Sequence, residues 1–246
     1  MLDTSVLAAQ TAGTAWTAGT AWTCSVLMSA DDTPGAMTFT INGADLAGTA
    51  LAEVTAVSEG QDVTFDNAAP VLSAVTIASD NSVTTLAKTG DTLTLAFTAD
   101  AEINSPTCAF TVGGVTAAGA AVVVADTSTG AGTGWSCAYE FDAGDSEGVV
   151  EFTIDATDLA GNAMARVMTV GDGTSVTFDN VAPTLTTVSI ASDSAADATL
   201  AKTGDTVTVL MEASEALAAA PTCAFTVGDE AATGSAVVVA DTSTGA

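Results

Sequence analysis

VTFDNAAPVLSAVTIASD occupies residues 63–80, and 113 positions later it returns as VTFDNVAPTLTTVSIASD at residues 176–193. Shorter stretches recur with nearly the same spacing, as LAKTGDT does at residues 86–92 and 200–206. Two single-residue insertions lengthen the spacing from 113 to 115 residues towards the C-terminus. Self-similarity at one period indicates a structural unit that is used more than once. The repeat therefore decides how this chain is organised.

The repeat divides the chain into one complete unit and two halves. Residues 65–177 hold the complete unit, residues 19–64 match its C-terminal half, and residues 178–246 match its N-terminal half. Residues 1–18 precede these three segments as an overhang. We expect each half to need the strands of a neighbouring copy to complete its domain.

The two ends of the chain fit together in the repeat. VVVADTSTGA closes the chain at residues 237–246, and its earlier copy at residues 122–131 is followed at once by GTGWSC. Gly19 begins the similar stretch GTAWTC, so joining Ala246 of one copy to Gly19 of the next restores the repeat without a gap. We expect either a window on a longer tandem array or separate chains that join head to tail. If the chains are separate, the expected partner is a copy of the chain itself, joined head to tail in a filament; in a longer array, the next repeat completes the unit by continuity of one polypeptide.

Apolar residues in the complete unit alternate with a period of two, which is the pattern of half-buried strands. Short stretches rich in Gly and Asp, such as TGD and DLAGN, separate these runs and favour turns. About seven short strands without a helical period predict an all-β fold, and favour an antiparallel β-sandwich over a small barrel or a β-solenoid. Three of the predicted strands carry the alternating residues Leu93, Leu95 and Phe97, then Cys108, Phe110 and Val112, then Trp135, Cys137 and Tyr139.

The junction between two units resembles that of a known family. TIDATDLAGN at residues 153–162, followed by VTFDNVAPTL at residues 176–185, resembles the tandem immunoglobulin-like (Ig-like) repeats of bacterial surface proteins and giant adhesins. The resemblance covers nearly the whole chain after residue 19. It implies tandem antiparallel Ig-like β-sandwiches with a repeat of about 113–115 residues, and it implies interdomain Ca²⁺ sites in some members.

The four cysteines fall at two positions of the unit. Cys108 and Cys137 lie 29 residues apart on inward faces beside Trp135, which predicts a disulfide between two sheets, with two buried free thiols as the alternative. Cys24 and Cys223 are their counterparts in the two halves, so we expect them to bond between neighbouring copies. We expect no zinc site, because the chain has no CxxC motif and no histidine. Disulfides predict an extracellular or cell-surface location.

Composition excludes several functions. The chain has 30 Asp and Glu against three Lys and Arg, a formal net charge of −27, and no histidine. Nucleic acids and anionic lipids require Lys or Arg to neutralise phosphate, so we expect neither as a partner. No stretch has the sustained apolar content of a membrane span. Without histidine, neither a Ser-His-Asp nor a Cys-His arrangement can be built, and we expect no enzyme.

Oxygen-bearing side chains gather where one unit meets the next. Turn and linker oxygens are the ligands that Ca²⁺ uses. They predict an interdomain Ca²⁺ site, while Asx turns that cap strand ends are the alternative. The candidate ligands are Asp66, Asn67, Asp179 and Asn180 in the linkers, and Asp45, Asp155, Asp158 and Asn162 in the preceding turns.

These observations predict a non-catalytic structural module of an extracellular filament, stalk or adhesin, assembled linearly. A glycan- or protein-binding adhesion domain is the first alternative, although a glycan platform needs exposed Trp or Tyr and those of the repeat alternate inward. An Ig-like appendage of a larger enzyme is the second alternative.

Overall fold

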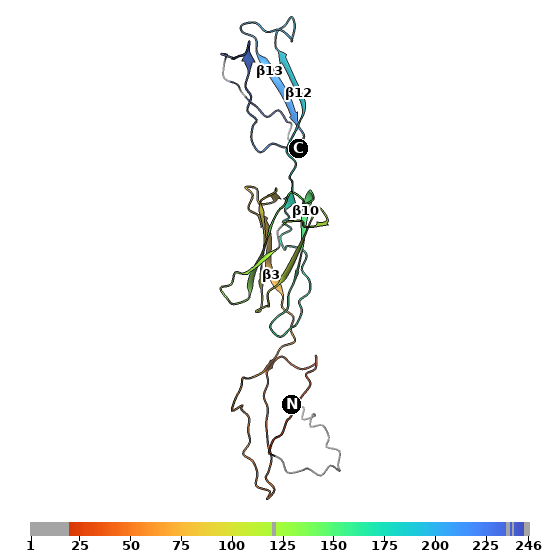
Figure 1. The fold of residues 1–246 in the computed structure, drawn as a ribbon, viewed down its shortest axis with the longest axis vertical. Helices are drawn as coiled ribbons and strands as arrows, with labels where there is room; N and C mark the ends of the chain where they lie inside the picture. The colour runs from red at the N-terminus through yellow and green to blue at the C-terminus, as the bar shows by residue number, and fades with distance from the viewer. Residues whose placement is uncertain (1–19, 120–121, 235–236, 238, 244–246) are drawn as a thin grey trace. The chain divides into compact units, whose positions relative to one another are not determined.

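The computed structural model describes residues 20–119, 122–234, 237 and 239–243 (Figure 1). All regular structure in these residues is strand, which confirms the predicted all-β class. No helix of the described residues could cross a membrane. The predicted overhang, and the residues Gly19 and Ala246 whose join restores the repeat, lie outside the described residues. The chain forms two compact units, one ending at Phe178 and one beginning at Asp179.

Residues 72–178 form two sheets with one shared hydrophobic core. The four-stranded sheet has the order β3-β5-β9-β8, with β3 (Leu72–Ser79), β5 (Thr92–Ala99), β9 (Gly134–Glu140) and β8 (Val123–Asp126). The five-stranded sheet has the order β4-β11-β10-β6-β7, with β4 (Leu86–Ala87), β11 (Thr177–Phe178), β10 (Gly148–Asp155), β6 (Thr107–Val112) and β7 (Val115–Thr116). In Figure 1, β3 and β10 mark the two sheets.

The strand pairs follow the predicted antiparallel pattern with one difference. Among the strand pairs of this region, β11 and β4 alone run parallel, through Thr177 opposite Leu86 and Phe178 opposite Ala87. The strand that ends the region therefore pairs with a short strand near its beginning. Sequence alternation carries no information on direction, since side chains of parallel and antiparallel strands both alternate between faces.

The core follows from the alternation of apolar residues along each strand. On β5, Leu93 and Leu95 are fully buried while Thr94 between them is exposed. Aromatic rings fill the space between the sheets, and the rings of Phe141 and Phe178 stack with centroids 5.0 Å apart. The other large core residues are Ile77, Phe97, Ile103, Phe110, Val112, Tyr139, Val150, Phe152, Ile154 and Val176.

A disulfide joins the two sheets through the core. Cys108 on β6 and Cys137 on β9 are bonded, with Cα atoms 6.4 Å apart, as the alternation predicts. Trp135, two residues before Cys137, packs against the core, and its indole N–H donates to the Gly132 carbonyl at 3.0 Å. The disulfide links β6 of one sheet to β9 of the other, so the two sheets cannot separate without breaking a covalent bond.

Separate two-stranded pairings make up the flanking segments. Residues 20–66 contain β1 (Gly35–Ala36) and β2 (Thr64–Phe65), which pair antiparallel. The second unit contains two hairpin-like pairs, β12 (Leu185–Ser192) with β13 (Val207–Ala213), and β14 (Thr226–Val227) with β15 (Glu230–Ala231).

Candidate assembly interface

The N-terminal flanking segment reproduces the strand register of its counterpart in residues 72–178. Gly35 lies opposite Phe65, just as Gly148 lies opposite Phe178. The bridge between Ile41 and Val54 likewise repeats the one between Ile154 and Val167. Similar sequence therefore makes the same local pairs, even though this segment lacks the remaining strands of the fold.

The second unit reproduces the register of the other half. Ile190 on β12 lies opposite Val209 on β13, as Ile77 on β3 lies opposite Leu95 on β5. The β14–β15 pair places Thr226 opposite Ala231, in the register that joins β6 to β7. The strand pairs that form in the two halves therefore have the registers of their counterparts in residues 72–178.

Burial separates the N-terminal half from its counterpart. Phe152 is 6% exposed and Ile154 is fully buried, whereas Phe39 and Ile41, at the same positions of the repeat, are 38% and 48% exposed. The residues are identical, and Ile41 keeps the bridge to Val54 that Ile154 makes to Val167. The difference arises because β6, which pairs with β10, and β3 and β5, which belong to the sheet on the other side of the core, have no counterpart within residues 20–66.

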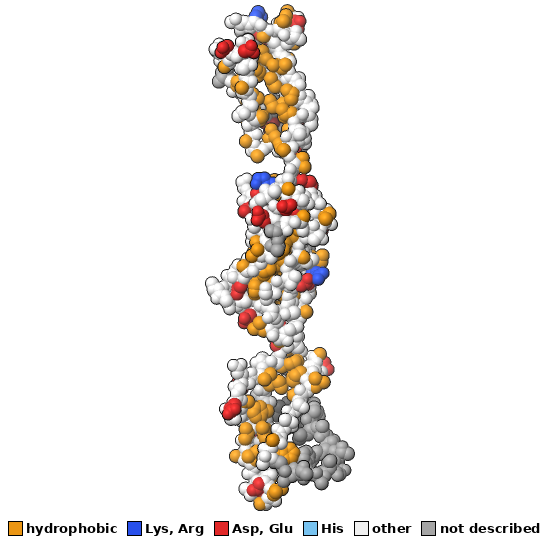
Figure 2. Space-filling model, viewed as in Figure 1, with side chains coloured by type: hydrophobic (Ala, Val, Ile, Leu, Met, Phe, Trp, Pro, Cys, Tyr) orange, Lys and Arg blue, Asp and Glu red, His pale blue; other side chains and the backbone are white. Residues whose placement is uncertain are grey.

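The C-terminal half shows the same contrast. Ile77 is 4% exposed, while its counterpart Ile190 on β12 is 66% exposed. Figure 2 shows hydrophobic side chains gathered on the surface of the second unit, and the exposed ones on one face of β12 and β13 are Val188, Ile190 and Val207. An exposed apolar patch of this kind marks an interaction surface or an aggregation hazard.

The remaining cysteines lie in these two halves. Cys24 is exposed and Cys223 is partly buried, and neither is bonded within the chain. They occupy the positions of Cys137 and Cys108, which are bonded in the complete fold. The predicted bond between copies stays a prediction.

A buried polar cluster that sequence reasoning missed lies near one end of β9. The Tyr139 hydroxyl donates to Asp145 at 2.7 Å, and Asp145 also accepts from the backbone N–H groups of Ala118 at 2.7 Å and Asp142 at 2.9 Å. The Gly119 N–H donates to the Tyr139 hydroxyl at 2.6 Å. Burial raises the pKa of Tyr139, and the neighbouring Asp145 carboxylate adds to the rise.

The N-terminal half contains part of this cluster. Asp32 occupies the repeat position of Asp145 and accepts from the Ser29 N–H at 2.6 Å, which is the counterpart of the bond from Asp142. The counterpart of the Ala118 N–H belongs to Thr233, which lies in the second unit. In the sequence, this cluster could have been found from the recurrence of Asp32 as Asp145, 113 residues later.

Three of the predicted calcium ligands meet at the start of the complete fold. Asp158 is buried, and it accepts from both the backbone N–H and the side-chain amide of Asn162, each at 2.8 Å. The same amide nitrogen donates to the Asp66 carbonyl at 3.1 Å. The hydrogen bonds from Asn162 lower the pKa of Asp158. These contacts are those of an Asx turn that is hydrogen-bonded to the linker. The group that lies between the Asp158 and Asp66 oxygens is the Asn162 amide, which is a hydrogen-bond donor.

Two further predicted ligands lie in turns or ion pairs. Asp45 repeats the turn of Asp158 and accepts from the Thr49 N–H at 2.8 Å, which lowers its pKa. Asp155 pairs with Arg166, whose Nη2 lies 2.8 Å from its Oδ2.

The linker residues complete the set of predicted ligands. The Asn67 side-chain amide donates to the Ala30 carbonyl at 3.2 Å. Asp179 accepts from the Val181 N–H at 3.1 Å, and Asn180 is the residue between Asp179 and Val181. Within the described residues, no three acidic or cysteine side chains are grouped closely enough to hold a metal. The calcium site stays a prediction.

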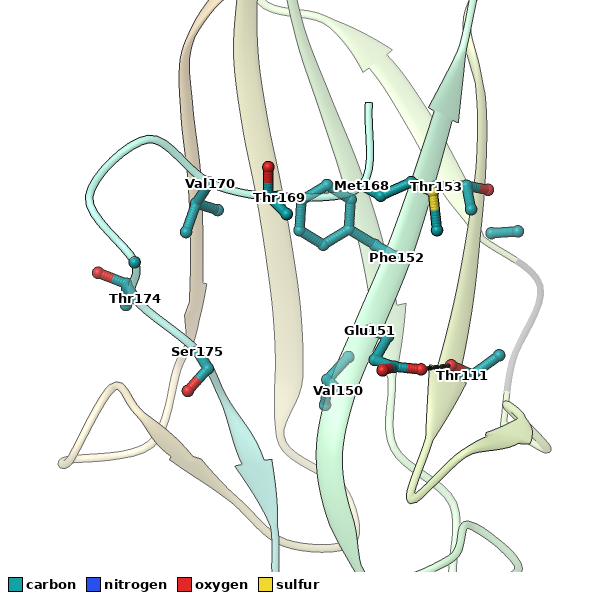
Figure 3. Close-up of a pocket in the computed structure, with 12 residues that line it drawn as sticks. Thr111, Val150, Glu151, Phe152, Thr153, Met168, Thr169, Val170, Thr174 and Ser175 are labelled. Carbon is teal, nitrogen blue, oxygen red and sulfur yellow. Dashed lines mark hydrogen bonds between the residues drawn. The ribbon is translucent and has the colours of Figure 1, made fainter. Parts of the chain in front are cut away.

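A hollow of about 420 Å³ lies on the five-stranded sheet, where residues 168–175 pass beside β10 (Figure 3). Thr111 and Glu151 are hydrogen-bonded on one side of it at 3.2 Å. The aromatic residue in its lining is Phe152, which is buried in the core. The hollow therefore lacks the exposed ring that a sugar stacks upon.

No family model matches this chain, and neither a curated protein nor a solved structure matches it.

Proposed function

We propose that the chain is a non-catalytic structural segment of an extracellular linear assembly of Ig-like domains. Each flanking half is completed by the opposite half of a neighbouring copy, either within a longer polypeptide or from a separate chain. Copies joined by one head-to-tail contact extend in a line, because such a contact does not close on itself. The Cys108–Cys137 disulfide supports an oxidising location outside the cytoplasm.

The strand order of residues 72–178 supports the Ig-like assignment. An Ig-like sandwich places strands A, B, E and D in one sheet and C, F and G in the other. We letter the strands in chain order and leave out the two-residue strands β4 and β7. The order β3-β5-β9-β8 is then A-B-E-D, and β6-β10-β11 is C-F-G. The disulfide joins C to E instead of the B–F pair of antibody domains.

The observation that carries the proposal is the exposure of Ile41 beside the burial of Ile154. The strand pairs that form in the two halves keep the registers of their counterparts in residues 72–178, and the repeat segments missing from one half are present in the other. Burying apolar side chains stabilises by about 25 cal/mol per Å² removed from water. Completion between copies buries these faces and pairs their open strand edges.

The test uses two full-length variants, each with one half disabled. Ile41→Asp places a charge in the N-terminal half and Ile190→Asp places one in the C-terminal half, both at positions that are exposed in the single chain. We expect the unaltered chain to form oligomers that lengthen with concentration in sedimentation velocity. Each variant alone stays monomeric, and an equimolar mixture stops at dimers, because one intact junction remains.

Leu46→Asp is the matched control. Leu46 is 94% exposed, and its counterpart Leu159 remains 63% exposed in the complete fold, so this position lies outside the completed core. We expect this variant to assemble like the unaltered chain. A chain that stays monomeric at all concentrations, or Ile41→Asp and Ile190→Asp variants that still polymerise alone, would contradict head-to-tail completion.

A further inference from the structure

Residues 21–27 are the counterpart of β9 in the first half. In the complete fold, β9 is the central partner of both β5 and β8. In the single chain, residues 21–27 are exposed throughout and belong to no strand of the described region. Their alternating residues Cys24 and Val26 stand where Cys137 and Tyr139 enter the core. We call residues 21–27 the donor segment.

The β13 strand has an edge that is open for such a partner. In the complete fold, β5 lies between β3 and β9. Its counterpart β13 is paired with β12 alone among the described strands of the second unit. An open edge presents a row of backbone N–H and C=O groups that can pair with another strand.

The side chains on this edge match the donor segment. Val207 on β13 is 38% exposed, and Val209 and Met211 are partly buried. Their counterparts Leu93, Leu95 and Phe97 are buried against the second sheet. In the register of the complete fold, Val207 lies opposite Val26 and Val209 lies opposite Cys24, so no charged pair meets along the seam.

We infer that the donor segment of one copy adds to β13 of the next as an antiparallel strand, with Thr208 opposite Ser25. The inference rests on the proposed function and specifies which two strands pair and in which register. The register is that of Thr94 opposite Ala138 in the β5–β9 pair. A shift of one residue would turn Cys24 and Val26 to the outer face, so the buried side chains specify the pairing.

The position of Cys223 in the repeat agrees with this register. In the complete fold, Cys137 lies opposite Leu95 on one sheet and Cys108 lies opposite Ile154 on the other, and the two are bonded. The same register places Cys24 opposite Val209. Cys223 takes the place of Cys108, within reach of Cys24.

The register is tested by cysteine pairs in the full-length chain, with Cys24→Ser and Cys223→Ser removing the unpaired native thiols. Thr208→Cys with Ser25→Cys should give a ladder of covalent oligomers on mild oxidation, seen on non-reducing gels. Thr208→Cys with Thr23→Cys is the control, because that pair is displaced by two residues and its Cβ atoms are too far apart for a disulfide. We expect at least a tenfold difference in linked product.

A synthetic peptide of residues 20–28 with Cys24→Ser provides the second measurement. We expect it to bind the chain and shorten the oligomers seen in sedimentation, while a scrambled peptide of the same composition does not. If oligomers form but the displaced pair links equally well and the peptide has no effect, the donor-strand inference is wrong and head-to-tail completion stands. If no oligomers form, both are wrong.

Discussion

Cys108 and Cys137 are bonded between strands that belong to opposite sheets, so the bond links the two sheets covalently through their shared core. The bond closes a loop with a sequence separation of 29 residues. Closing a loop of that length stabilises by roughly 3–4 kcal/mol in the chain-entropy model.

The first prediction concerns this bond. Mass spectrometry of a non-reduced digest should show the peptides of Cys108 and Cys137 linked. The double variant Cys108→Ser/Cys137→Ser should lower the melting temperature by several degrees, in line with the lost constraint on the unfolded chain. Free thiols at both positions in protein purified without reductant would contradict the pairing.

The second prediction concerns Tyr139. Tyr139→Phe removes the hydroxyl that donates to Asp145 and accepts from Gly119, and it should cost about 1–3 kcal/mol of unfolding free energy because buried polar groups lose a partner. Chemical denaturation measures this loss. An unchanged midpoint would show that the cluster contributes nothing.

Alkaline pH should destabilise the chain through the same residue. Burial raises the pKa of Tyr139 above the ordinary value, so the folded chain holds the proton more tightly than the unfolded chain. Stability from this group is therefore complete below about pH 10 and is lost as pH rises above it. Tyr139 is the one tyrosine of the sequence, so tyrosinate absorbance follows it directly, and Tyr139→Phe should lack this part of the alkaline loss.

A matched pair of substitutions should separate the complete fold from the halves. Phe152→Ala removes a buried ring and should cost about 3–5 kcal/mol of unfolding free energy. Phe39→Ala, at the same repeat position, should cost much less in dilute chain and should instead weaken oligomer formation. Thermal melts at low and high protein concentration measure both, and equal effects on the melt of dilute chain would contradict an exposed N-terminal half.

Salt should promote assembly. Residues 19–66 carry seven acidic residues and no Lys or Arg, and residues 179–246 carry nine acidic residues and Lys202 alone. The two halves repel each other, and about 0.15 M salt shortens the range of that repulsion to about 8 Å. Sedimentation should show longer oligomers at about 0.15 M than at about 0.01 M salt. Shorter oligomers at higher salt would indicate ionic attraction at the junction.

The junction turn should be stable through its own hydrogen bonds. Asp158→Ala removes the acceptor of two bonds from Asn162 and should lower the melting temperature even in EDTA. Bound calcium requires a second effect, in which EDTA lowers the melting temperature of the unaltered chain and has no effect on the variant. If EDTA changes neither protein, the Asx turn is the whole role of Asp158.

Local patterns in the sequence were enough for the class of fold and for the disulfide. Strand alternation is a property of neighbouring residues, so the pattern alone places Leu93, Leu95 and Phe97 on one buried face. Cys108 and Cys137 follow from the same alternation. The division into one complete unit and two halves also follows from the sequence, because a repeat is recognised by comparing residues and requires no knowledge of their contacts.

The tertiary structure decided what depends on residues that are distant in sequence. The parallel pairing of β4 with β11 and the burial of Asp145 against Tyr139 both require segments to be brought together in space. The structure also placed the Asn162 amide between Asp158 and Asp66, where the sequence suggested only a group of oxygens. The same dependence leaves Ile41 exposed while Ile154 is buried: burial is decided by the strands that cover a residue, and the residue's own sequence neighbourhood does not contain them.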